Sequence, residues 1–221
     1  MLIKRWIPSP FKCARPTGCP LDMIVIHHIG SKDGKLYSVP GAIAWFTNVS
    51  LHRNPKTGAI ENKVSAHYII PRQIYETQTD MIGLVKHEEV AYHAGESNWI
   101  VNGVTRSDIN NYSIGIELEG DGNLCEYTDF QYERLEELVR ELMQNHQIPE
   151  SNIVGHEDVA PGRKIDPGKL FDWKRFRAGL GPKTQVDVPS AIPVPDEQFY
   201  MGSGENQHPN LFSRILKLFH L

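Results

Sequence analysis

The stretch "DMIVIHHI" at residues 22–29 limits the fold of this chain more than any other segment. Most of its residues are apolar, several of them are β-branched, and the stretch ends at Gly30. A strand with apolar side chains on both faces is typical of the centre of a sheet that other layers cover. The stretch therefore predicts a buried strand in a layered α/β fold.

A second strand and a long helix have similarly clear patterns. The segment "YSIGIELEG" (112–120) alternates apolar with other residues, as a strand does. In the segment 128–147, Thr128 and Gln131 match a capping box, and Pro149 lies just beyond the end. One apolar stripe follows at helical spacing, made of Phe130, Leu135, Leu138, Val139, Leu142 and Met143.

Shorter elements complete the predicted domain. Residues 63–71 and 73–79 are β-like runs that we expect to form a hairpin around Pro71-Arg72. Residues 152–156 predict a short strand, and residues 171–180 predict a final short helix. Because strands alternate with helices, we predict a central mixed β-sheet flanked by helices.

One short helix is expected near the first strand. Pro40 precedes the segment "GAIAWFTNV" (41–49), where it favours the start of a helix. Ile43 and Phe46 are the side chains expected to face inward, and Trp45 is a further candidate. The whole predicted domain covers residues 1–180.

The last part of the chain differs in composition. Residues 181–210 are rich in proline, glycine and polar residues, which predicts a linker or a disordered tail. Residues 211–221 are amphipathic and predict a short helix that docks on its own domain or on a partner. Attachment to a membrane surface is the weaker alternative, because the segment has only two basic residues.

The bulk composition excludes several classes of protein. A net charge of −4 argues against a nucleic-acid binder. The sequence also has no apolar run of about 18 residues, the length that a helix needs to cross a membrane. The N-terminus lacks a signal-peptide pattern, so we expect a cytoplasmic protein, or else an exported or phage-released one whose leader is missing. Three cysteines, Cys13, Cys19 and Cys125, favour free thiols over a Cys13–Cys19 bridge.

Ionisable residues are concentrated in the loop "GHEDVAPGRKIDPG" (155–168), which glycines and prolines break up. His156 is the last residue of a predicted strand, and a folded loop can bring Asp166 back to it. Either His27 or His28 can add a second imidazole, because neighbouring strand residues point to opposite faces and the pattern does not choose between them. Two imidazoles and one carboxylate, with a fourth position open, suit a catalytic Zn²⁺ site. The alternative is a surface loop with hydrogen-bonded core histidines.

The strand at 112–120 adds a carboxylate. Glu117 lies on its less apolar face, where Gly115 leaves space that a substrate cleft would use. If this face views the metal, Glu117 can take a proton from water, and Lys164 can stabilise an oxyanion. If it faces solvent, the carboxylate is an ordinary surface charge.

Several motifs resemble those of one enzyme family. They are "IPSPFKCARP", "IVIHHIG", "VSAHYII", "AYHAGES", "NNYSIGIELEG" and "VGHEDVAPGRKIDPGKLFDW", and they span residues 7–173. The chain resembles the zinc-dependent N-acetylmuramoyl-L-alanine amidases of type 2, the family that includes the peptidoglycan-recognition proteins. The segments "PSP…RP" and "GRK-x-DPG" are similar to the branch of cytosolic anhydro-muropeptide amidases of cell-wall recycling.

The resemblance implies a zinc ion at one end of the sheet. The family's ligands fall on His27, His156 and Asp166, its acid/base glutamate on Glu117, and its transition-state lysine on Lys164. The implied reaction is hydrolysis of the amide between the lactyl group of N-acetylmuramic acid and L-alanine in peptidoglycan fragments. An endolysin acting on intact wall, or a module that binds without cleaving, are the alternatives.

Three further residues fall in motifs that line the family's cleft. His67 and His93 are expected to shape the substrate site, and Arg163 to meet a peptide carboxylate. The segment "SLHRNPKTGAIENK" (50–63) departs from the family pattern, so the groove wall can differ there. The sequence makes no prediction of the oligomeric state.

Overall fold

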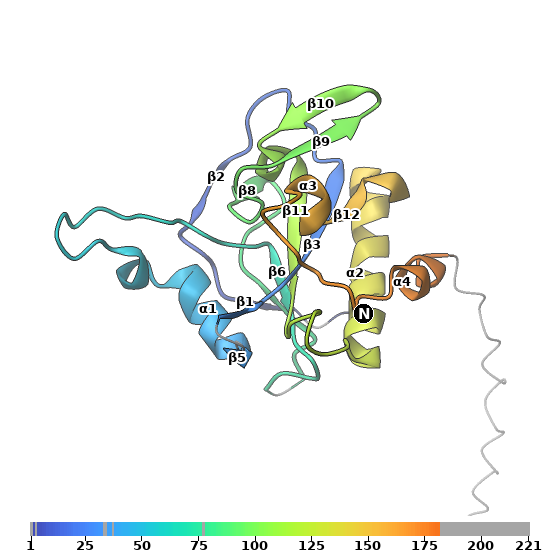
Figure 1. Ribbon diagram of the computed structural model, residues 1–221, viewed down its shortest axis with the longest axis horizontal. Coiled ribbons are helices and arrows are strands. Elements are labelled where there is room, and N and C mark those ends of the chain that lie inside the picture. Colours follow the sequence, from blue (N-terminus) through green and yellow to red (C-terminus); the bar gives the residue numbers. More distant parts are fainter. Residues whose placement is uncertain (1, 3, 33–34, 37, 77, 182–221) are drawn as a thin grey trace, which may run out of the picture. The chain divides into compact units, whose positions relative to one another are not determined.

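The computed structural model describes residues 2, 4–32, 35–36, 38–76 and 78–181. A six-stranded sheet forms its centre (Figure 1). The strands lie in the order β1 (Lys4–Trp6), β7 (Met81–Gly83), β6 (Tyr68–Ile70), β11 (Ser113–Leu118), β3 (Met23–His28) and β12 (Ile153–Gly155). Only β6 and β7 pair antiparallel within this sheet, so the predicted mixed α/β fold is confirmed.

The remaining elements lie around this sheet. The helices are α1 (Val39–Thr47), α2 (Asp129–His146), α3 (His156–Val159) and α4 (Trp173–Gly179), with 3₁₀ turns at Val49–His52, Ile109–Tyr112 and Glu150–Asn152. Three small antiparallel pairs are β2 (Lys12–Ala14) with β8 (Glu89–Ala91), β9 (Asn98–Val101) with β10 (Val104–Ser107), and β4 (Ser31–Lys32) with β5 (Lys35–Leu36).

Helix α2 covers one face of the sheet (Figure 1). Its N-terminus has the predicted capping box, in which Thr128 accepts from the Gln131 N–H and Gln131 accepts from the Thr128 N–H. This satisfies two backbone donors that a helix start leaves unpaired. Apart from Phe130, which lies under the Arg134 guanidinium, the predicted apolar stripe packs against the even-numbered residues of β3 and β11, which include Ile24, Ile26, Ile114, Ile116 and Leu118.

The opposite face carries the odd-numbered strand residues. Met23 and Val25 of β3 pack there with Ala94, Ile109 and Val159. Elsewhere on this face α1 packs against Ile69 and Ile82 through Val39, Ala42 and Phe46. No long helix covers β3 on this side among the described residues, so the chain covers it with turns and α3. This leaves one end of the face to polar side chains.

The predicted strand at 73–79 is wrong, because its described residues, 73–76 and 78–79, form a turn. Glu76 and Gln78 adopt positive φ angles of 49° and 61°, and Tyr75 pairs with Thr79 across the turn. The backbone therefore reverses within the run, and β6 pairs with β7 instead. The β-like composition of this run predicted a strand. A polar turn and a strand at the polar edge of a sheet can have the same composition, so the sequence pattern did not distinguish them.

Trp45 corrects a second prediction. Helix α1 begins at Val39, two residues before the predicted start, and buries Val39, Ala42 and Phe46. Trp45 lies off this stripe and is 44% exposed, while Ile43 is partly buried against the same cluster. Trp45 is one residue from Phe46 and therefore lies about 100° away from it around the helix, beside the stripe that Val39, Ala42 and Phe46 form.

Other sequence predictions fall partly outside the described residues. The predicted linker at 181–210 lies outside the described residues except for residue 181. The predicted amphipathic segment at 211–221 lies wholly outside them. No described helix has both the length and the apolar character needed to cross a membrane. All three cysteines are free thiols.

The packing of α2 gives a stability prediction. Leu138 is fully buried between α2 and the sheet, so Leu138→Ala should cost about 2–5 kcal/mol of unfolding free energy through a cavity. Gln144→Ala on the exposed face of α2 is the control and should change it by less than about 0.5 kcal/mol. Urea unfolding measures both, and equal stability of the two variants would contradict this packing.

Candidate metal centre and catalytic site

The register of the parallel strands decides between the two neighbouring histidines. His27 continues the odd-numbered face of β3, away from α2, and its side chain is buried. His28 points to the other side, where its Nδ1 accepts a hydrogen bond from Gly122 N at 3.1 Å. The structure therefore places His27, and not His28, on the face that carries Glu117.

His156 reaches the same place from the next strand. Strand β12 runs parallel to β3 with Gly155 opposite Ile26, so the chain delivers His156 level with His27. Helix α3 begins at His156, where the Asp158 carboxylate accepts from Gly155 N at 2.7 Å. The imidazole Nε2 donates to Ala94 O at 3.0 Å, which leaves its Nδ1 free of a proton.

Asp166 is returned to the site by a tightly held loop. Its carbonyl accepts from Glu157 N at 2.9 Å, and the next carbonyl, of Pro167, accepts from Tyr127 Oη at 2.7 Å. A Cβ on Gly122 would lie only 1.9 Å from the Pro167 oxygen, so this contact requires glycine. The glycines and prolines of the loop thus allow the close packing that positions the carboxylate.

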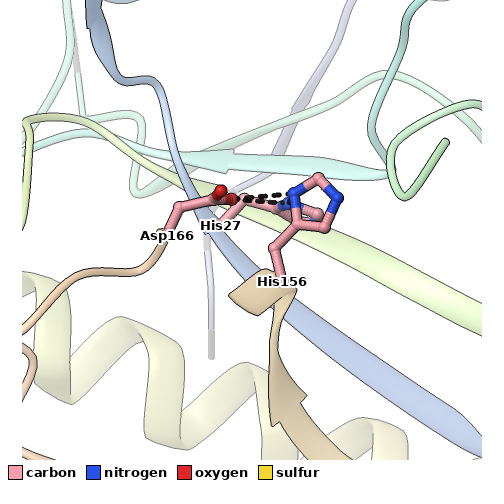
Figure 2. A group of neighbouring side chains, drawn as sticks. All are labelled: His27, His156 and Asp166. Carbon is pink, nitrogen blue, oxygen red and sulfur yellow. Dashed lines mark hydrogen bonds and ion pairs between the residues drawn. The ribbon is translucent and has the colours of Figure 1, made fainter. Parts of the chain in front are cut away.

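The three side chains point at one another (Figure 2). His27 Nδ1 lies 2.9 Å from His156 Nδ1, and each of these nitrogens lies 3.0 Å from Asp166 Oδ2. Two imidazole nitrogens and a carboxylate oxygen are the donor types that Zn²⁺ binds, and all three residues are buried. This donor set fits a divalent transition-metal ion.

The protonation states favour a cation as well. Burial, with the neighbouring His156 next, lowers the pKa of His27 from 6.5 to about 4, so the ring is neutral at pH 7. Burial raises the pKa of Asp166, whereas a proton on the facing nitrogen of His156 or His27 lowers it below its ordinary value, and a bound cation would act in the same direction. The neutral His27 imidazole beside the Asp166 carboxylate is ready to bind a metal ion.

Glu117 lies beside this group. It pairs with His27 in the parallel register of β11 and β3, so both side chains point to the same face. The residue is 7% exposed, and Glu117 Oε2 has no hydrogen-bond partner among the described residues. Burial, and then the Asp166 charge, raise the pKa of Glu117 well above its ordinary value. A buried, unpaired carboxylate with a raised pKa is suited to proton transfer.

Lys164 and Arg163 occupy the loop between α3 and Asp166. The Lys164 charge lowers the pKa of both Glu117 and His27, so it acts on both sides of the site. Arg163 Nη2 donates to Ala94 O at 2.7 Å and also to Glu96 O. That guanidinium nitrogen therefore holds the backbone of a neighbouring loop, and the expected contact of Arg163 with a peptide carboxylate stays a prediction.

Gly115 has a different role from the one its sequence position suggested. A Cβ on Gly115 would lie 2.4 Å from Cγ of His93, so the space beside Glu117 is filled by the His93 ring. His93 Nδ1 lies 2.9 Å from His27 Nε2, and His93 is buried. His67 is buried behind Gly115, where its Nδ1 accepts from Gly115 N at 3.0 Å. Both histidines thus support the site from within.

Arg15 was not among the predicted site residues, although it lies in the "ARP" motif. Its guanidinium donates to five backbone carbonyls, those of His87, Glu89, Asn110, Asn111 and Ser113, at 2.7–3.4 Å. It joins β8 to the turn before β11 and so supports the loop that carries His93. In the sequence, the only indication of this role was an arginine that stands between a small residue and a proline.

Comparisons with known proteins agree with this geometry. The family model described as N-acetylmuramoyl-L-alanine amidase matches residues 17–169. The chain belongs to this amidase family. The predicted family and enzyme class are thereby confirmed. The protein is an amidase that cleaves the amide bond between N-acetylmuramic acid and L-alanine.

Individual relatives are similar over most of the chain. The 1,6-anhydro-N-acetylmuramyl-L-alanine amidase AmpD of Salmonella typhimurium (strain SL1344) is 37% identical over 79% of this chain and 88% of its own length. The crystal structure of a Se-Met AmpD derivative has a TM-score of 0.66 at 34% identity, covering 81% of this chain and 99% of that one.

A third relative was solved with a ligand. The amidase AmiD from E. coli, in complex with anhydro-N-acetylmuramic acid-L-Ala-D-gamma-Glu-L-Lys, has a TM-score of 0.56 at 28% identity. The match covers 74% of this chain and 60% of that chain. The fold that surrounds the three candidate ligands is thus shared with amidases.

Buried His67 gives a prediction for the metal-free protein. Burial lowers the pKa of His67 from 6.5 to about 3, so between these values the unfolded chain binds a proton that the folded chain does not. Its contribution to stability is complete above pH 6.5 and falls by about 1.4 kcal/mol per pH unit as the pH drops below that value.

His67→Leu tests this sign. The variant lacks the acceptor of the Gly115 N–H and should be less stable at pH 7, but its stability should depend less steeply on pH between 6.5 and 4. Urea unfolding with a chelator present measures both slopes. An unchanged slope would show that His67 is protonated in the folded state.

Proposed function

We propose that this chain hydrolyses the amide between the lactyl group of N-acetylmuramic acid and L-alanine in soluble, 1,6-anhydro peptidoglycan fragments, with Zn²⁺ as cofactor. The observation that carries the proposal is the convergence of His27, His156 and Asp166 beside the buried, unpaired Glu117. Three protein ligands leave a coordination position for chemistry, whereas four are typical of structural zinc.

His27, His156 and Asp166 are the proposed zinc ligands. A zinc ion bound there would supply Lewis-acid chemistry, polarising a carbonyl and lowering the pKa of water. The neutral state of the His27 ring and the ionised state of Asp166 support this assignment. Their burial excludes bulk water, so electrostatic contacts inside the site are strong.

Glu117 is the proposed proton-transfer residue. Its raised pKa allows the carboxylate to accept a proton from the attacking water and then to give it to the leaving alanine nitrogen. Lys164, whose charge acts on Glu117, is proposed to stabilise negative charge on the carbonyl oxygen of the scissile amide. Proton transfer of this kind typically contributes about 10²–10⁴ to the rate.

The proposed substrate and location rest on the relatives. The name of the Salmonella relative specifies the 1,6-anhydro sugar, and the E. coli AmiD complex contains an anhydro-muropeptide. We therefore propose small anhydro-muropeptides as substrates and the cytoplasm as the place of action. His67 and His93 are proposed to shape the site from beneath, and Arg163 to do so through the loop it holds.

Two substitutions test the assigned roles. Glu117→Gln keeps the shape of the side chain but removes the base, so it should retain bound zinc and lose about 10²–10⁴ in kcat. Asp166→Asn should lose both zinc and activity, because it removes an anionic ligand. Glu133→Gln on the exposed surface of α2 is the control. Normal turnover by Glu117→Gln would refute the assigned base.

A substrate comparison separates recycling from wall lysis. We expect release of L-alanine-linked peptide from a soluble anhydro-muropeptide and little release from intact sacculi. Mass spectrometry of both incubations, with and without a chelator, identifies the bond that is cleaved and the need for metal. Faster release from sacculi would favour the endolysin alternative, and no release from either would favour a binding module.

A further inference from the structure

Two consecutive residues lie behind both candidate imidazole ligands. His27 Nε2, the nitrogen that faces away from Asp166, lies 2.9 Å from His93 Nδ1. The corresponding nitrogen of His156, Nε2, lies 3.0 Å from Ala94 O. One side chain and one backbone carbonyl from a single short segment thus contact the outer edge of both rings.

The hydrogen-bond partners of His93 fix where its proton lies. Ser113 Oγ donates to Ile109 O at 2.7 Å, which uses its single proton. The same Oγ must therefore accept from His93 Nε2–H, which is 3.1 Å away. A neutral ring with its proton on Nε2 has a lone pair on Nδ1, so His93 accepts from His27 Nε2–H.

The consequence for His27 is a defined tautomer. With its proton on Nε2, the ring presents the Nδ1 lone pair to His156 and Asp166. A carbonyl oxygen only accepts, so Ala94 imposes the same tautomer on His156. Both rings then aim lone pairs at the Asp166 carboxylate, an arrangement that a cation stabilises.

The His93–Ala94 segment is itself held firmly. Asn110 Oδ1 accepts from His93 N at 3.0 Å and from Ala94 N at 2.7 Å. Arg163 Nη2 donates to Ala94 O, the same oxygen that receives the His156 proton. The next residue, Gly95, has a φ of +59°, a left-handed conformation that glycine adopts without strain. These contacts prevent the segment from moving away from the rings.

We propose that His93 and the Ala94 carbonyl are the positioning elements of the metal centre, which orient His27 and His156 and fix their tautomers. The proposal rests on the metal site of the proposed function. Outer partners of metal-bound histidines typically contribute about 10–100-fold to metal affinity. His93 touches no reacting atom, so it acts through His27.

The first test observes the protons directly. Nitrogen-15 NMR of the histidine rings in the full-length, metal-free chain at pH 7.5 should show His93 neutral and protonated on Nε2. A proton on His93 Nδ1 would overturn the proposal, because that nitrogen could not then accept from His27. This result is independent of whether the chain binds zinc or cleaves muropeptides.

The second test measures zinc affinity by competition with a chromogenic chelator. His93→Leu should raise the zinc dissociation constant about 10–100-fold. His93→Asn, whose Oδ1 can take the place of Nδ1 as acceptor, should restore part of the affinity. The matched control is His52→Leu, which removes a buried histidine whose nitrogens contact the Trp45 and Asn62 carbonyls and no candidate ligand.

The outcomes separate the proposals. A folded His93→Leu variant that binds zinc as tightly as the wild type would overturn the positioning role. If that variant does not fold, His93→Asn decides. Zinc affinity as low in His93→Asn as in Asp166→Asn would contradict the role of the residue at position 93 as a hydrogen-bond acceptor for His27. A wild-type chain without zinc affinity would instead refute the metal site, while the NMR result for His93 would stand.

Discussion

The parallel register of β11, β3 and β12 is the constraint on which the site depends. It places Glu117 opposite His27 and Gly155 opposite Ile26, so that His156 follows at the level of His27. Because side chains alternate along a strand, a shift of one residue would turn His27 toward α2 and bring His28 to the other face. The apolar face under α2 resists such a shift, since it would bury polar groups in the core.

The two faces of the sheet therefore have separate tasks. The α2 face is an apolar core, whereas the other face ends in a group of buried polar side chains. Burying such groups is costly unless each finds a partner, and the histidines have theirs in backbone, serine or one another. Glu117 Oε2 has no hydrogen-bond partner among the described residues, so this oxygen is available to bind water or substrate.

Residues far from the chemistry support it through the backbone. Arg15 joins the strand β8 to the turn before β11, and Asn110 in that turn holds the backbone of His93 and Ala94. Arg163 reaches the same segment from the loop that carries Asp166. The motifs "ARP", "HAG" and "GRKIDPG" are thus parts of one hydrogen-bonded unit, although they are separated by many residues in the sequence.

The sequence by itself determined the strands β3 and β11 and the helix α2, and it named the candidate site residues His27, His156 and Asp166 that the structure brings together. Local periodicity and capping encode such elements, and the motifs carry the donor types. Strand periodicity left His27 and His28 as alternatives and only the family motif favoured His27, whereas the tertiary structure turns His28 away from Glu117. The tertiary structure also decided that His93 fills the space at Gly115, that Tyr75 pairs with Thr79 and that Arg163 donates to the backbone of a neighbouring loop. Each of these depends on register and on contacts between distant segments, which no local pattern records.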